Sequence, residues 1–358
     1  MGENLTSIDW NVTTVVRRFT YGLYWFTHGR NVLKWRIGYA LEIMQAGYFP
    51  ILGIVGIPVN IITIVILRRK NCGLSKCVTC YLLGMAVGDL LVVILDIILR
   101  QIPIVFMEQF LFLQSIPVCN IHAVLLFAAT DCSVWFTVTF TFDRFVAICC
   151  PKLKSKYCSE KTASVVLGTV SVLSCLKNIF WYFMFSTGYR LANTPWFCDV
   201  ERYVYYSPVW AAIDFLHNIL TPCVPFVLIL LFNVFTVRHI VVSSRARRRL
   251  RAHSVGDSPR DPEMESRRKS IMLLFIITAN FILLWSLFMI YSIWYRMLYF
   301  GFNSMQLDNF VRELGFMLQL LSCCTNTAIY AVTQTQFRQQ WKNVLKYPFT
   351  PFLQFIKS

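Results

Sequence analysis

The sequence predicts an all-α membrane protein, a seven-transmembrane helix bundle followed by a short amphipathic eighth helix. Three observations predict this fold: the composition, the number of long apolar stretches and the distribution of positive charge. Of the 358 residues, 56% are hydrophobic and only 15% are charged, whereas soluble domains carry about 25% charged residues. A soluble chain of this composition would have more apolar surface than one core can hide, and a bilayer removes that difficulty.

Long apolar stretches mark the membrane-spanning helices, each of which needs about 20 apolar residues in succession. Residues 48–67 meet this requirement without a charge, and Arg68, Arg69 and Lys70 follow directly. Six further stretches qualify, at 77–99, 119–149, 162–184, 207–237, 270–294 and 313–332. We therefore expect residues 45–332 to form one seven-transmembrane domain.

The positive charges indicate the orientation of the chain. With the N-terminus outside, the predicted inner connections hold 22 Lys and Arg residues and the outer segments hold 10. Because positive residues favour the cytoplasmic side, we predict an extracellular tail (1–44), a third cytoplasmic loop (238–269) and a cytoplasmic eighth helix and tail (333–358). The only two glycosylation sequons begin at Asn4 and Asn11 in the outer tail, which agrees with this orientation, although such tripeptides also occur by chance.

The thirteen cysteines do not indicate a disulfide framework, because most lie in predicted helices or on the reducing, cytoplasmic side. Cys119, at the start of the third helix, and Cys198, in the loop between the fourth and fifth helices, are the two on the predicted outer side. We predict a bridge between them that pins this loop over the bundle.

The third cytoplasmic loop is strongly basic. Its run of arginines at 245–251 is expected to extend the fifth helix, and the Gly and Pro residues at 256–262 are expected to end it. A basic strip beside a membrane attracts anionic lipid, and contact with a cytoplasmic protein is a second role that the sequence leaves open. Ser254 and Ser270 follow basic residues and are candidate phosphorylation sites.

Polar motifs recur inside the apolar stretches in a fixed order. One of them places the ionised pair of Asp143 and Arg144 at the inner end of the third helix, where burial of charge costs free energy and therefore suggests a function. The motifs are Gly56-Ile57-Pro58-Val59-Asn60, Met85-Ala86-Val87-Gly88-Asp89, Asp143-Arg144-Phe145, Pro225, Trp285, Asn326-Thr327-Ala328-Ile329-Tyr330 and Phe337. Together they resemble the rhodopsin-like (class A) G-protein-coupled receptors over about residues 45–345.

The resemblance implies a plasma-membrane receptor that binds an extracellular small molecule or peptide and activates heterotrimeric G proteins, with arrestin as a further partner. Within the class, the chain is most similar to the orphan receptors responsive to tryptophan and phenylalanine. The shared features are the Gly-x-Pro-x-Asn of helix one, the missing Trp of helix four and Asn233 in helix five. The residues implied for the G-protein coupling switch are Asp143, Arg144, Phe145, Asn326 and Tyr330.

Several departures from the family pattern concern this switch. Helix six lacks the proline that usually follows its Trp, and Thr327 replaces the motif proline of helix seven. Phe145 replaces Tyr, and Arg267 stands where many relatives carry an acid that pairs with Arg144. These departures put the energetics of switching in question rather than the fold.

Asp89 lies in the middle of a predicted membrane helix. Either it is a buried, protonated and hydrogen-bonded structural carboxyl, or it binds Na⁺ as an allosteric ion, which the resemblance implies with Ser133 and Asn326 as co-ligands and Ser322 nearby. Oxygen donors suit a hard cation, and we favour the sodium site. No other cofactor is expected. Asp96 and Asp131 are further intramembrane acids, and Asp131 is expected only to satisfy a neighbouring helix.

The resemblance also implies a ligand pocket at the outer end of the bundle. Leu126 stands where amine receptors place an Asp, which argues against a biogenic amine, and Phe288 replaces an Arg of the tryptophan-responsive subfamily. The aromatic wall, with Arg100, Asp214 and Arg312 near its mouth, suits a ligand with an apolar body and a polar or anionic end, although several aromatics must simply pack between helices. The implied pocket residues are Leu126, Phe127, Thr130, His217, Thr221, Trp285, Phe288, Met289 and Phe316.

No enzyme constellation is evident, because the five histidines are scattered and no phosphate-binding Gly loop is present. No nucleic-acid partner is expected. A weakly coupling chemosensory or decoy receptor-like protein remains an alternative to a signalling receptor. A transporter or channel is a more distant one, since inverted repeats are absent from the sequence.

Overall fold

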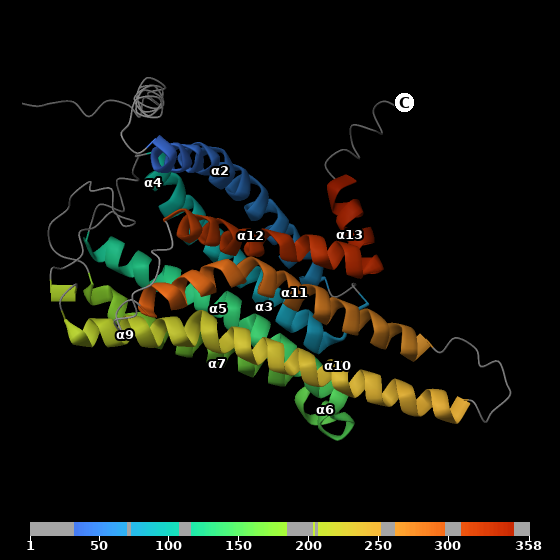
Figure 1. Ribbon diagram of the computed structural model, residues 1–358. Coiled ribbons are helices and arrows are strands. Elements are labelled where there is room, and N and C mark those ends of the chain that lie inside the picture. Colours follow the sequence, from blue (N-terminus) through green and yellow to red (C-terminus); the bar gives the residue numbers. More distant parts are fainter. Residues whose placement is uncertain are drawn as a thin grey trace, which may run out of the picture.

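The computed structural model describes residues 32–69, 73–106, 116–184, 203–204, 207–251, 262–297 and 309–346. Over these ranges the chain is helical, and seven of the described helices are long and apolar enough to cross a membrane (Figure 1). Large apolar side chains point outward from them, as at Ile54 (75% exposed) and Val332 (71% exposed). Surface of this kind requires hydrocarbon around it, so the predicted fold class is confirmed.

The seven spans consist of helices and of short irregular segments between them. The first four spans are α2 (Val32–Arg68); α3 (Lys76–Val92), η1 (Val93–Gln101) and α4 (Ile102–Phe106); α5 (Ile116–Cys149); and α7 (Glu160–Asn178) with η3 (Ile179–Phe183). The last three are α9 (Pro208–Asn218), η4 (Ile219–Cys223) and α10 (Val224–Arg251); α11 (Pro262–Met297); and α12 (Asn309–Thr333). Two short helices, α6 (Pro151–Tyr157) and α13 (Thr335–Lys346), follow the third and seventh spans at the end of the bundle that is called the inner end after the predicted orientation.

The helices α2 and α11 begin earlier than the apolar pattern predicted. α2 starts at Val32 rather than near residue 48, and α11 starts at Pro262 rather than at residue 270. An apolar stretch marks only the part of a helix that lies in hydrocarbon, while backbone hydrogen bonding continues through adjoining polar sequence. Pro262 is favoured at a first helical position because it has no N–H to leave unpaired.

The starts of α3 and α7 are set by side-chain caps. Ser75 accepts a hydrogen bond from the backbone N–H of Val78, and Ser159 accepts one from that of Thr162. Each bond satisfies a donor that the first helical turn would otherwise leave free. Just before Ser75, Gly73 has a φ of 66°, a conformation that glycine adopts without steric cost.

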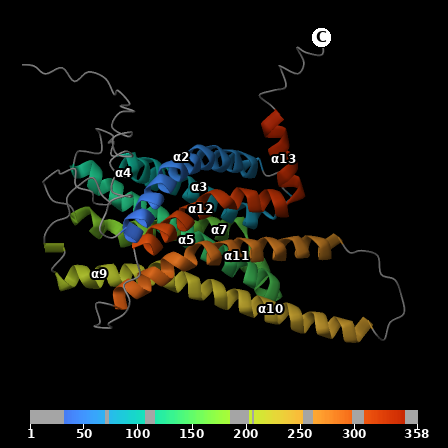
Figure 2. The same ribbon diagram turned by 45° about the horizontal axis from the view of Figure 1, so that its top comes forward.

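The third span, α5, lies at the centre of the bundle (Figures 1 and 2). It packs against α3, α7, α10 and α11. In its membrane-spanning window 56% of the residues are buried, compared with 17% in the fourth span. Polar groups on α5 are therefore within reach of side chains from several other helices.

Two spans depart from regular α-helix. The second span contains the π-helix η1, an arrangement that often marks a functional position. The fifth span breaks at Thr221, whose φ of −151° and ψ of 105° are non-helical. Pro222 explains this break, because a residue that precedes proline is pushed into the extended region.

At the inner end, α10 and α11 project together beyond the other helices, and α13 turns away from α12 (Figures 1 and 2). α10 reaches Arg251, so the basic run extends the fifth helix as predicted; residues 252–261 lie outside the described residues. In α13, Phe337 is fully buried and its ring meets those of Tyr330 and Trp341. The predicted short eighth helix is thereby anchored to α12.

Candidate functional site: the inner switch and the outer aromatic clusters

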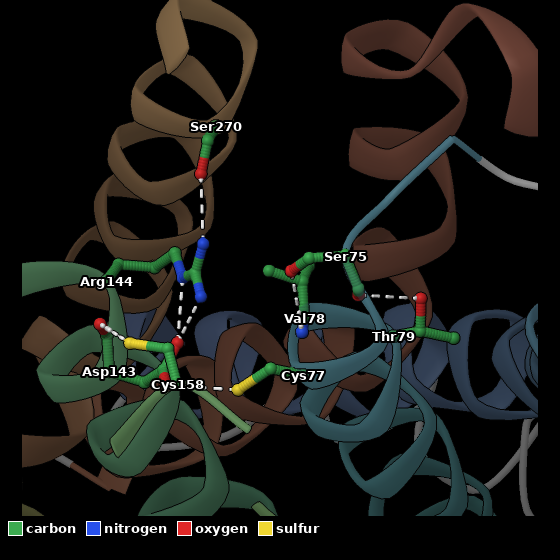
Figure 3. A network of polar contacts seen from close by, with 8 residues as sticks. All are labelled: Ser75, Cys77, Val78, Thr79, Asp143, Arg144, Cys158 and Ser270. Atoms are coloured by element: carbon green, nitrogen blue, oxygen red, sulfur yellow. Dashed lines mark hydrogen bonds and ion pairs between the residues drawn. The ribbon is translucent and has the colours of Figure 1, made fainter. Parts of the chain in front are cut away.

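Arg144 is held at the inner end of α5 between an acid and a serine. Its Nε atom donates to Oδ2 of Asp143 at 2.9 Å, and its Nη2 atom forms an ion pair with the same oxygen. Its Nη1 atom donates to Oγ of Ser270 in α11 at 3.3 Å (Figure 3). The Asp143 and Arg144 side chains are buried, with 3% and 8% exposure. This arrangement connects the inner ends of the third and sixth spans.

Two cysteines complete the surroundings of Asp143. The thiol of Cys77 in α3 donates to Oδ1 of Asp143 at 3.2 Å, and that of Cys158, just after α6, donates to the Asp143 carbonyl at 3.7 Å (Figure 3). Burial, and then the nearby Asp143 carboxylate, raise the pKa of the Cys158 thiol to about 11, so it stays protonated at neutral pH and can donate. The sequence predicted neither cysteine here, because nothing in their spacing indicates a contact with Asp143.

The other residues predicted for the switch lie apart from Arg144. Phe145 stacks on Phe232 of α10, with ring centroids 5.7 Å apart. Tyr330 is buried, and among the described residues its hydroxyl has no hydrogen-bond partner. Asn326 hydrogen-bonds to Asp89 instead. The described structure therefore brings Asp143 and Arg144 together and leaves Asn326 and Tyr330 further along the bundle.

A second polar contact joins α10 and α11. The Thr278 hydroxyl in α11 donates to Oδ1 of Asn233 in α10 at 3.3 Å. Asn233 was noted in the sequence as one of the features shared with a group of orphan receptors, and this contact gives it a structural role between the fifth and sixth spans.

Asp89 is fully enclosed between α3, α5 and α12. Ser133 donates to its Oδ1 atom and Asn326 to its Oδ2 atom, each at 2.7 Å. Ser322 accepts a hydrogen bond from Nε1 of Trp285 at 3.2 Å, which ties the same region to α11. The donor set consists of a carboxylate, hydroxyls and an amide, a chemistry that fits a hard monovalent cation. A bound cation would replace the hydrogen bonds that Ser133 and Asn326 now make to the carboxylate.

The predicted pocket residues divide between two separate apolar clusters. Leu126 and Phe127 of α5 belong to one, which also contains Trp181 of η3. Phe127 and Trp181 stack with ring centroids 4.5 Å apart, and the His217 ring lies 5.2 Å from that of Phe127. Trp181 was not among the predicted residues, because its position in the fourth span gave no signal beyond apolarity.

The second cluster joins α11 to α5 and α10, and Phe288 extends it to α12. Trp285 stacks on Phe281 at 5.3 Å, and Phe288 meets Phe316 at 4.8 Å. The Arg100 guanidinium carbon lies 5.9 Å from the centre of the Phe316 ring. Met289 is partly exposed. The Thr130 hydroxyl donates to the Leu126 carbonyl one turn earlier on the same helix. This hydrogen bond does not connect Thr130 to another span.

A buried charged cluster lies between the third, fourth and fifth spans. Asp131 accepts hydrogen bonds from Asn178 at 2.6 Å and from Thr221 at 2.7 Å, and Nζ of Lys177 lies 2.7 Å from its Oδ2 atom. Nε1 of Trp181 donates to Asn178 at 3.1 Å. Thr221, predicted for the pocket, therefore directs its hydroxyl at Asp131. Asp131 was expected to satisfy a neighbouring helix; it contacts two, and Lys177 was missed.

A second buried pair lies in the π-helix of the second span. Nη1 of Arg100 is 3.2 Å from Oδ1 of Asp96, and Nε2 of Gln101 donates to the same oxygen at 3.0 Å. All three side chains are buried. The wider turn of η1 places residues four and five positions apart around one carboxylate, and it leaves the Arg100 cation beside Phe316.

Some predicted residues lie outside the described part of the chain. Asn4, Asn11 and Cys198 are among them, and so is the side chain of Arg267. Cys119 is disulfide-bonded, and its pairing with Cys198 stays a prediction.

The comparison with known proteins agrees with this architecture. A profile of the family described as 7 transmembrane receptor (rhodopsin family) matches residues 59–330. The chain therefore belongs to the rhodopsin family of seven-transmembrane receptors, a class that signals through G proteins and is not enzymatic. Among individual proteins it is similar to G-protein coupled receptor 39 of Bos taurus, with 30% identity over 149 residues. That match covers 40% of this chain and 32% of the relative, so the chain matches about a third of that receptor's length.

Proposed function

We propose that the chain is a plasma-membrane receptor, with its N-terminus outside, that binds an extracellular small molecule or peptide and activates heterotrimeric G proteins. The observation that carries this proposal is the hydrogen bond from Arg144 to Ser270, which joins α5 to α11. It belongs to a closed arrangement that a ligand can bias by binding the open one more tightly. In the open arrangement α11 moves away from α5 and exposes Arg144 to a G protein. Arrestin and anionic lipids are further partners on the inner side, where the basic third cytoplasmic loop lies.

The ligand has an apolar body and a polar or anionic end. Two observations support this choice: the aromatic pair of Phe288 and Phe316, and the Arg100 cation 5.9 Å from the Phe316 ring. The resemblance to orphan receptors responsive to tryptophan and phenylalanine makes aromatic amino acids and short peptides the first compounds to test. Phe288, in place of that subfamily's Arg, is the residue that weighs against free amino acids.

The experiment is a ligand screen in cells that carry G-protein dissociation sensors, followed by Arg144→Ala at equal surface level. We expect the variant to keep binding an active compound and to lose G-protein activation, because the proposed pocket and Arg144 lie at opposite ends of the bundle. Phe142→Ala, a change of an exposed ring on the same helix, is the matched control. Full signalling by Arg144→Ala would make Arg144 a structural residue only.

A weakly coupling chemosensory or decoy receptor is the second candidate. The observation that favours it is the absence of the usual prolines from α11 and α12 after Trp285 and Asn326. Thr327 instead pairs with Thr63 of α2, with the two hydroxyl oxygens 2.7 Å apart. A G-protein recruitment assay without ligand separates the candidates, since a decoy recruits none.

The outer side is proposed to carry a Cys119–Cys198 bridge over the ligand entrance and sugars on Asn4 and Asn11. The support is the disulfide state of Cys119 and the position of both sequons before the first span. Mass mapping of surface-expressed protein, without reduction and before and after N-glycosidase treatment, is expected to find the bridge and the sugars. A free thiol on Cys198, or unmodified asparagines, would contradict the corresponding part.

A further inference from the structure

Ser270 occupies the place on α11 that faces the guanidinium of the switch. Arg144 directs its Nε and Nη2 atoms at Asp143 and its Nη1 atom at Oγ of Ser270, 3.3 Å away (Figure 3). A hydroxyl there offers a cation only a neutral acceptor. Hydrogen bonds to ionised acceptors are roughly twice as strong as neutral ones, so the closed arrangement is held less firmly than this geometry permits.

The sequence before Ser270 is a run of positive charge, Arg267-Arg268-Lys269. Basic residues directly before a serine are the pattern that basophilic protein kinases recognise through their acidic surface, an example of charge patterns setting kinase specificity. Arg268 is exposed, and Ser270 itself is partly exposed. The serine that contacts the switch is therefore also the serine that carries the recognition pattern.

The helix around Ser270 is suited to local opening. Along the described side chains of α11, the first buried ones are Leu273 and Leu274, which belong to the main inner core. The residues from Pro262 to Lys269 include only one large apolar residue, Met264. A helix end with little buried apolar surface opens at low free-energy cost, which lets a kinase bind this segment in the extended form that it needs.

We propose that Ser270 is a regulatory phosphorylation site. A basophilic kinase transfers the γ-phosphoryl group of ATP to Oγ; the new O–P bond forms as the bond to ADP breaks, and the hydroxyl proton passes to the base of the kinase. The product carries about −1.5 to −2 charges and three acceptor oxygens. Placed beside Arg144, it forms the ion pair between α5 and α11 that neutral Ser270 does not supply.

The net positive charge around Ser270 favours a phosphate at this position. Asp143 repels the phosphate, while Arg144 and the three basic residues before Ser270 attract it. In the closed arrangement Ser270 is engaged with Arg144; separation of α11 from α5 releases it. The kinase therefore modifies the open receptor preferentially, and the modification then favours closure. The modification itself is independent of the proposed function, and only its effect on signalling rests on it.

The first test is labelling of the purified full chain in lipid nanodiscs with ATP and the catalytic subunit of cyclic-AMP-dependent protein kinase. We expect phosphate on Ser270 by mass mapping, lost in Ser270→Ala and kept in Ser254→Ala, the control for the other serine that follows basic residues. Arg144→Gln, which removes the contact that engages Ser270, is expected to be labelled faster. Labelling confined to other serines in both the wild type and Arg144→Gln overturns the proposal.

The second test measures what the phosphate does. Phosphorylated wild type is expected to melt several degrees higher than unphosphorylated protein, and Arg144→Gln is expected to show no such rise. In cells, Ser270→Asp should lower ligand-free G-protein dissociation by about two- to fivefold, the range of a partly screened ion pair, relative to Ser270→Ala.

The outcomes separate this inference from the proposed function. An equal rise in melting temperature in Arg144→Gln places the effect of the phosphate elsewhere and overturns the inference. An Arg144-dependent rise without G-protein signalling in any variant supports the Ser270–Arg144 pair and defeats the proposed function instead.

Discussion

Asp89 shows at the scale of single residues how a buried charge is accommodated in this bundle. Its two oxygens each accept a hydrogen bond at 2.7 Å, from Ser133 on one side and Asn326 on the other. A buried carboxylate without such partners would be strongly disfavoured. A cation would bind the same oxygens. The hydrogen bonds from Ser133 and Asn326 and a bound cation are therefore alternative ways to stabilise the carboxylate.

Asp89→Asn is expected to abolish the response of the receptor to sodium while preserving surface expression. The amide keeps the shape of the carboxyl and can still hydrogen-bond to Ser133, but it lacks the charge that attracts the ion. The measurement is the melting temperature of purified protein in NaCl, with choline chloride at equal ionic strength as the control. A sodium-dependent rise of equal size in wild type and variant would rule out a site at Asp89.

At the scale of elements, the cluster around Asp131 joins three spans at one point. It connects α5 to α7 through Asn178 and Lys177, and α5 to η4 through Thr221. Thr221 is also the residue at which the fifth span leaves helical geometry. The hydrogen bond from Thr221 to Asp131 therefore anchors the fifth span to α5 at the point where its helix breaks.

Lys177→Met is expected to destabilise the protein by about 3–5 kcal/mol, because removal of one partner leaves a buried charge uncompensated. The double variant Asp131→Asn, Lys177→Met should recover most of this loss, since it removes both charges together. Thermal unfolding of the purified variants measures both effects. Lys161→Met, at an exposed lysine near the start of the same helix, is the control. Equal losses in the single and double variants would show that the ion pair contributes little.

The elements also show how far the sequence alone could lead. Hydrophobicity predicted all seven spans, since membrane helices are marked by composition. It missed the early starts of α2 and α11, because polar helix outside hydrocarbon carries no such mark. For the site, the family resemblance implied that Asp89, Ser133 and Asn326 meet, and that Arg144 pairs with Asp143. The thiol of Cys77, the amine of Lys177 and the ring of Trp181 were not predicted, because these contacts depend on how neighbouring helices rotate.

At the scale of the whole molecule, two hydrogen bonds among the described residues join the sixth span to the third and fifth spans at the inner end. Arg144 donates a hydrogen bond to Ser270, and Thr278 donates one to Asn233, each at 3.3 Å. Neither bond joins two opposite charges, so the closed arrangement is held weakly. A receptor of this kind is expected to signal measurably without a ligand.

Arg267→Glu is therefore expected to lower ligand-free signalling. An acid at this position supplies the pairing partner for Arg144 that the family resemblance implies, and the substitution also removes a positive charge from this position. The shift in the equilibrium should be about 1 kcal/mol, the upper range measured for screened ion pairs. G-protein dissociation sensors in cells measure it at equal surface expression, with Arg268→Glu as the matched control. Unchanged or higher basal signalling in Arg267→Glu alone would contradict this account.

One helix carries residues of the outer aromatic cluster, the Asp131 cluster, the Asp89 site and the inner switch. Along α5 follow Phe127, Asp131, Ser133 and Arg144, and about 26 Å separates the first from the last at 1.5 Å per residue. If α5 couples the outer and inner sites, their effects on each other's binding affinity are reciprocal by thermodynamic necessity. Whatever factor an outer compound adds to the affinity of an inner partner, the inner partner must add to the affinity of that compound. A protein that binds only the open inner face would thus raise the affinity of the receptor for outer compounds. Such a protein would make it possible to detect compounds that bind too weakly on their own.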